Sequence, residues 1–74
     1  MKYYKIEFKH TNVTYCYRVN GNEVTEVYLS DESERVSVTK YITKPKHIDV
    51  MLNNTTEIEK GEFLLILSKA IEQL

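Results

Sequence analysis

The fold is decided in residues 2–19, which read KYYKIEFKHTNVTYCYRV. Apolar and aromatic side chains alternate with polar ones over residues 2–9 and again over residues 13–19. A period of two is typical of β-strands that bury one face. The intervening His10-Thr11-Asn12 has turn chemistry, so the two segments predict an antiparallel hairpin.

The register of this hairpin follows from the alternation. If the last apolar residue of the first strand opposes the first of the second, the apolar sets coincide pair by pair. The predicted pairs are Phe8 with Val13, Ile6 with Tyr15 and Tyr4 with Tyr17. We expect these six side chains to form the buried face, which leaves Tyr3, Lys5 and Cys16 on the opposite side.

Asn20-Gly21-Asn22 predicts a second tight turn, because asparagine and glycine accept a positive φ. A two-residue Asn20-Gly21 loop would turn Val24, Glu26 and Tyr28 toward the core. A three-residue loop would instead bury Val27 and Leu29 and leave Glu26 and Tyr28 in water. Because burying an unpaired carboxylate costs several kcal/mol (~2 to 7 for a polar group), we predict the three-residue loop.

Residues 35–42 predict a fourth strand, with Val36, Val38 and Ile42 inward and Arg35, Ser37, Thr39 and Tyr41 outward. Residues 45–52 fit either a short helix after Pro45 or a fifth strand. From Glu59 onward the period becomes helical: Ile58 and Phe63 have the spacing of a hydrophobic staple around the Glu59 cap. The apolar stripe comprises Phe63, Ile66, Leu67, Ala70, Ile71 and Leu74.

The chain therefore predicts one α+β domain over residues 1–74. Its two layers are a four-stranded antiparallel meander, five-stranded if residues 45–52 are a strand, and a C-terminal helix packed on one face. With 74 residues the core is small, and with a single cysteine no internal disulfide forms. No signal peptide or membrane-spanning run is evident, so we expect a soluble cytoplasmic protein without a membrane partner.

Composition and motifs exclude most kinds of chemistry. The two histidines and one cysteine lack zinc-site spacing, and the acidic clusters lack the pattern of a calcium loop. No nucleophile is tied by sequence to a base. We expect no metal, no cofactor, no small-molecule substrate and no catalytic residue, and we interpret the chain as a non-enzymatic protein.

The candidate binding surface is the sheet face that the helix leaves uncovered. With the registers above, Tyr3, Arg18, Val24 and Tyr41 form one line across the four strands, flanked by Lys5 and Lys40. Tyrosine and arginine are over-represented at interface hot spots. Leu64 and Leu65 lie outside the helical stripe and predict a second contact surface with another subunit.

Two hypotheses of different classes follow. The favoured one is a protein-interaction module that binds itself, as a homo-oligomer, or a larger protein through the uncovered face. The alternative is single-stranded nucleic-acid binding on the same face, where tyrosines stack on bases and basic side chains meet phosphates. The predicted stacking residues are Tyr3, Tyr28 and Tyr41, and the predicted phosphate contacts are Lys5, Lys9, Arg18, Arg35 and Lys40. The net charge of −1 argues against the alternative.

Overall fold

The structure is a computed structural model, and it describes residues 1–73. The elements follow in the order β1 (Lys2–Phe8), β2 (Val13–Asn20), β3 (Glu23–Ser30), β4 (Arg35–Ile42), α1 (Pro45–Met51), β5 (Thr56–Ile58) and α2 (Lys60–Gln73). These strands form one open antiparallel sheet in the order β4-β3-β2-β1-β5. The α+β prediction with a C-terminal helix on the sheet is confirmed.

The first hairpin has the predicted register. Phe8 pairs with Val13, Ile6 with Tyr15 and Tyr4 with Tyr17. Thr11 closes the turn by donating its backbone N–H to the carbonyl of Phe8 at 3.2 Å, and Asn12 takes a positive φ of 51°. Asparagine tolerates this left-handed conformation better than most residues, in keeping with its place in the turn.

The second hairpin departs from the predicted three-residue loop. Asn20 pairs with Glu23, so the loop is Gly21-Asn22, with Gly21 at φ 62°. Cys16 therefore opposes Val27, and Tyr15 opposes Tyr28. The prediction was wrong because Glu26 does not need bulk water: it is half-buried, and the hydroxyl of Tyr41 donates to its Oε2 at 3.2 Å.

The one-residue shift redistributes the side chains between the two faces of the sheet. The α2 face, on which α2 packs, carries Tyr3, Lys5, Glu7, Thr14, Cys16, Arg18, Glu23, Thr25, Val27, Leu29, Val36, Val38, Lys40 and Ile42. The α1 face carries Tyr4, Ile6, Phe8, Val13, Tyr15, Tyr17, Val19, Val24, Glu26, Tyr28, Arg35, Ser37, Thr39 and Tyr41. Both faces contain buried residues, so the sheet has a core on each side.

The segment 45–52, ambiguous in the sequence, contains a short helix. Pro45 begins α1 after the extended Lys44, as a proline with fixed φ at the first helical position should. Ile48 of α1 packs into a cluster with Tyr17 and Val24 on the α1 face. The fifth strand, β5, comes later in the chain and pairs with β1 only at Tyr3, Tyr4 and Lys5.

The helix α2 has the predicted phase but packs on the unexpected face. Phe63 and Ala70 are buried with Tyr3, Cys16 and Val27, and the rings of Tyr3 and Phe63 are 5.2 Å apart. Cys16 and Val27 have small side chains, and both are fully buried in the cluster that contains Phe63. Ile71 is exposed despite its place in the predicted stripe, and Leu74 lies outside the described residues.

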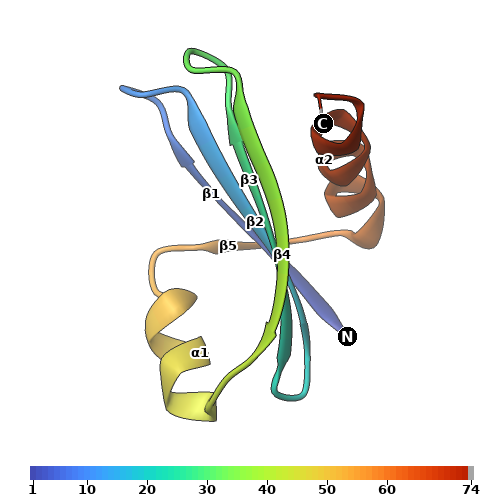
Figure 1. Ribbon diagram of the computed structural model, residues 1–74. Helices are drawn as coiled ribbons and strands as arrows, with labels where there is room; N and C mark the ends of the chain where they lie inside the picture. Colours follow the sequence, from blue (N-terminus) through green and yellow to red (C-terminus); the bar gives the residue numbers. More distant parts are fainter. Residues whose placement is uncertain (74) are drawn as a thin grey trace.

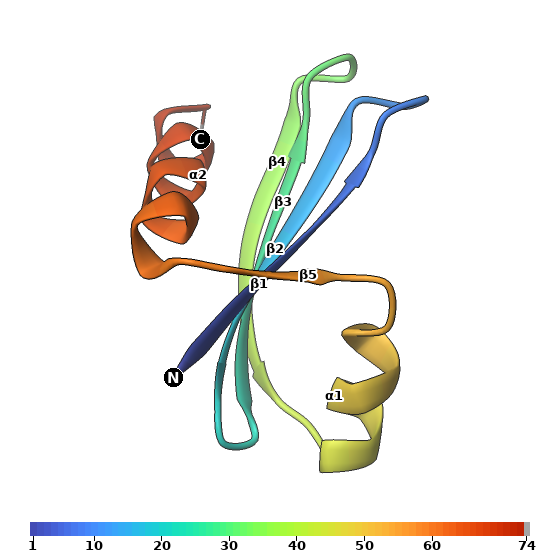
Figure 2. The same ribbon diagram turned by 180° about the vertical axis from the view of Figure 1, so that it is seen from behind.

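The two helices cover opposite faces at opposite ends of the sheet (Figures 1 and 2). α2 lies toward the end that carries the β1–β2 and β3–β4 turns, and α1 lies beside the end that carries the β2–β3 turn. Each face is therefore covered along only part of its length. The two bare half-faces are diagonally opposite each other.

The helix phase predicts unequal effects of two truncations in α2. Phe63 is fully buried, whereas the Leu65 side chain is 71% exposed. Phe63→Ala should lower the free energy of unfolding by about 3 to 5 kcal/mol, because it leaves a cavity, and Leu65→Ala by about 0.5 kcal/mol or less. Chemical denaturation of both variants at low protein concentration measures the difference. Equal losses at the two positions would contradict this phase.

The strand register predicts a protected thiol. Cys16 is fully buried, and burial raises the pKa of its thiol to about 12, with a smaller opposing effect of Lys5. At pH 8 its alkylation in the native protein should be at least about 100-fold slower than in the unfolded chain, since the thiolate is scarce and the sulfur is covered. Mass spectrometry follows the reaction. The matched control is Val50→Cys, at a position that is 75% exposed. Labelling of Cys16 in the native state as fast as labelling at position 50 would contradict the packing of α2 over this face.

Candidate functional site

The predicted line of four binding residues does not exist as one surface. Tyr3 and Arg18 oppose each other on the α2 face, but Val24 and Tyr41 oppose each other on the α1 face. Tyr3 and Val24 are also buried, Tyr3 against Phe63 and Val24 beneath α1. This placement was wrong because it depended on the three-residue loop at Asn20-Gly21-Asn22.

Lys5 and Lys40, which were to flank the line, lie on the α2 face in ion pairs. Lys40 Nζ is 2.9 Å from Glu23 Oε1. Next to this pair, Arg18 Nη2 donates to Thr25 Oγ1 at 3.3 Å. The bare half of the α2 face is therefore a charged surface whose groups already contact one another.

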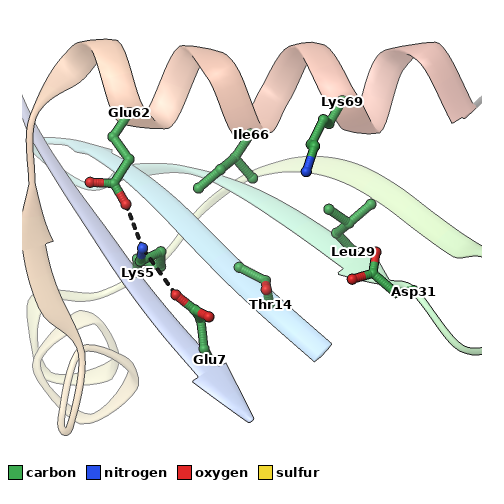
Figure 3. A pocket seen from close by; sticks show the side chains of 8 residues that line it. All are labelled: Lys5, Glu7, Thr14, Leu29, Asp31, Glu62, Ile66 and Lys69. Carbon is green, nitrogen blue, oxygen red and sulfur yellow. Dashed lines mark hydrogen bonds and ion pairs between the residues drawn. The ribbon is translucent and has the colours of Figure 1, made fainter. Parts of the chain in front are cut away.

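Lys5 holds α2 against the sheet (Figure 3). Its ammonium group pairs with Glu62 at the start of α2 and lies 3.0 Å from Oε1 of Glu7. Hydrogen bonds to Glu62 and then Glu7 raise the pKa of Lys5. The lysine borders an open hollow of about 300 Å³ between α2 and the sheet, lined also by Thr14, Leu29, Asp31, Ile66 and Lys69. The hollow thus carries charges of both signs, and its lysine is already paired with Glu62 and Glu7.

A partly exposed cluster of aromatic and apolar side chains lies on the α1 face, toward the β1–β2 turn. We call it the aromatic patch and define it as Ile6, Phe8, Val13, Tyr15 and Tyr28. Phe8 is 47% exposed and the other four side chains are half-buried. Ile6, Tyr15 and Tyr28 form one row across β1, β2 and β3, and Phe8 and Val13 stand beside it.

Tyr15 is the centre of the aromatic patch. Its ring centroid is 5.1 Å from that of Tyr28 and 6.0 Å from that of Phe8, which it meets edge to face. The ring of Tyr17, 6.4 Å away and nearly parallel, links the patch to the core beneath α1. Ring contacts at these distances are favourable beyond the area they bury, so the patch is a preorganised surface.

The phenol groups of the patch reach solvent. In residues 1–73, the hydroxyls of Tyr15 and Tyr28 take part in no hydrogen bond between side chains. No side-chain nitrogen or oxygen that is buried in this part of the chain lacks a hydrogen-bond partner, so these two unbonded hydroxyls are not buried. Under α1 the situation differs: burial, followed by the charge of Glu26, raises the pKa of Tyr41, whose hydroxyl lies 3.0 Å from Met51 Sδ. The patch therefore offers rings and free hydroxyls, whereas Tyr41 is part of the core.

The other predicted sites are placed as follows. Leu64 and Leu65 are 43% and 71% exposed, as expected for residues outside the packed stripe. Asp31, Glu32 and Glu34 occupy the β3–β4 turn, where Asn12 donates to Glu32 across 3.1 Å. Within the described part of the chain, no three histidine, cysteine or acidic residues are grouped as a metal site would require.

The alternation of apolar residues predicted that most residues of the aromatic patch share one face of the sheet. It did not predict that this part of the face is partly exposed. Four residues of the patch, all except Tyr28, were assigned from sequence to the core under the C-terminal helix. The signal that could have corrected this is the enrichment in tyrosine, since a phenol hydroxyl needs water or a partner. Tyr28 joins the patch only through the register of β2 and β3.

Neither helix within residues 1–73 has the length and apolar character needed to cross a membrane. Comparisons of the chain with known protein families, with curated protein sequences and with solved structures gave no match. Inference about function therefore starts from the geometry of the aromatic patch.

Proposed function

We propose that this chain is a non-enzymatic protein-interaction module that binds a protein partner through the aromatic patch. The observation that supports the proposal is the cluster around Tyr15, where three rings meet at the edge of the α1 core and Phe8 is 47% exposed. Contiguous exposed apolar patches on soluble proteins often mark the sites where a partner binds.

The arrangement suits binding energetically. Tyr15 is restrained by its neighbours Phe8, Tyr17 and Tyr28, so little side-chain entropy is lost when a partner docks on it. Tyrosine combines a large apolar surface with a hydroxyl that can hydrogen-bond to a partner. We infer an apolar anchor from the partner over the rings, with polar contacts to the hydroxyls of Tyr15 and Tyr28 at its rim.

Single-stranded nucleic acid is the alternative ligand, since exposed rings on a sheet can stack on bases. The charges near the patch disfavour it. Lys5 and Lys40, which were to meet phosphates, lie on the opposite face in ion pairs, and the acidic turn 31–34 follows β3 directly. Arg35 lies on the α1 face and Lys9 follows Phe8 in the sequence, but phosphate binding relies on several more such groups.

The proposal is tested by photo-crosslinking in the native host. A photoreactive phenylalanine analogue at position 8 should capture a defined protein, because this ring is exposed within the patch. The same analogue at Val50, an exposed position on α1, is the control. Tyr28→Ala should weaken binding of the captured protein by about 2 kcal/mol, and Val50→Ala should leave it unchanged.

The alternative ligand is examined in parallel with a fluorescent oligonucleotide at two salt concentrations. We expect no binding at low salt. Affinity that falls by about 0.7 log unit per log unit of salt for each neutralised phosphate would favour nucleic acid instead. Equal crosslinking at positions 8 and 50, with no effect of Tyr28→Ala, would reject the aromatic patch as a protein-binding surface.

A further inference from the structure

The β4 strand is an open edge of the sheet. It pairs with β3 continuously from Arg35 opposite Ser30 to Ile42 opposite Glu23, and residues 1–73 place no strand on its other side. Its eight residues contain neither proline nor glycine, and residues 36–39 are uncharged. The opposite edge, β5, is only three residues long. Long, regular edge strands are the templates on which another chain adds.

On each face of β4 one end is packed against a core and the other end is exposed. The packed end is the start of the strand on the α2 face and the end of the strand on the α1 face. On the α2 face Val36 packs against the core, Val38 is 39% exposed and Ile42 is 79% exposed. On the α1 face the order is reversed, because Tyr41 packs beneath α1 whereas Ser37 is exposed. A two-fold axis perpendicular to the sheet would place the covered end of one copy beside the bare end of the other.

The charges of β4 permit this pairing. Arg35 and Lys40 lie on different faces of the strand, so in an antiparallel pair with equivalent faces on the same side they never oppose each other. The pairing with the best apolar match is centred on Thr39, which then opposes Thr39 of the second copy. In this register Ile42 opposes Val36 of the second copy, and Lys40 opposes its Val38.

The end of α2 supports the same register. The hollow lined by Asp31, Glu34 and Gln73 shows that α2 ends beside the start of β4. Ile42 of a second copy would lie opposite Val36, which is partly buried against the core, while the polar residues of the hollow stay at its rim. The Ile42 side chain, among the most exposed large hydrophobic side chains in residues 1–73, would then gain an apolar contact with Val36.

We propose that the chain self-associates through β4, which pairs antiparallel with β4 of a second copy about Thr39 and joins the two sheets into one. This inference is independent of the proposed function, because it uses the edge of the sheet and leaves the aromatic patch open.

Sedimentation over a range of protein concentrations tests the pairing. We expect a dimer, with Ile42→Lys raising its dissociation constant at least tenfold and Val50→Lys leaving it unchanged. The two positions are matched, at 79% and 75% exposure, so neither change should alter the circular dichroism of the subunit. A chain that stays monomeric at millimolar concentration would overturn the proposal. A dimer that is dissociated by Leu65→Lys but not by Ile42→Lys would also overturn it.

The register is tested by oxidation of variants that each add one cysteine on β4. Thr39→Cys should form a disulfide between copies, because the two positions oppose each other. Ser37→Cys should not, since its two copies would be displaced by about 13 Å along the strands. The native Cys16 is fully buried and serves as the internal control in both variants. Oxidation that links Ser37→Cys but not Thr39→Cys would exclude the register centred on Thr39.

Discussion

The pairing of Asn20 with Glu23 determines which side chains share a face in the whole sheet. Side chains alternate along a strand, so a shift by one residue would exchange the faces of β3 and β4 relative to β1 and β2. The two-residue turn, made possible by Gly21 at φ 62°, sets Cys16 beside Val27 and Tyr15 beside Tyr28. The small pair of Cys16 and Val27 lies on the α2 face, and the rings of Tyr15 and Tyr28 lie on the α1 face. Phe63 packs on the α2 face, and α2 is held there by the ion pair of Glu62 with Lys5.

The two helices then leave two bare half-faces of different chemistry. On the α2 face this half carries Lys40 paired with Glu23 and Arg18 bonded to Thr25, so its polar groups are already engaged. The half on the α1 face carries the aromatic patch, whose hydroxyls reach solvent. A partner that docks on the charged half must compete with existing ion pairs, which contribute little individually but must be replaced. A partner that docks on the rings gains buried apolar area without that competition.

The sequence predicted the strands, turns and helix better than it predicted which side chains share a face of the sheet. The first hairpin, the strand over residues 35–42 and the helix after Glu59 follow from periodicity and turn chemistry, which are local. The loop length after Asn20 is also local, but the choice between loops depended on whether Glu26 has a partner, and that partner is Tyr41, fifteen residues away. The prediction also assumed one core, whereas Ile48 on α1 and Phe63 on α2 create two. The binding surface was consequently assigned to residues that include Val24, which is fully buried.

The edge pairing and the aromatic patch would together shape one binding surface. The row of Ile6, Tyr15 and Tyr28 continues on β4 at Ser37. In the register centred on Thr39, Ser37 opposes Tyr41 of the second copy, which packs beneath that copy's α1. Each patch would then lie between its own α1 and the α1 of the second copy, and both patches would be on the same side of the joined sheet. A partner with two binding segments could engage both, and the second contact would form at the high effective concentration that linkage provides. Self-association at β4 would in this way raise the affinity for such a partner without adding any contact to the patch itself.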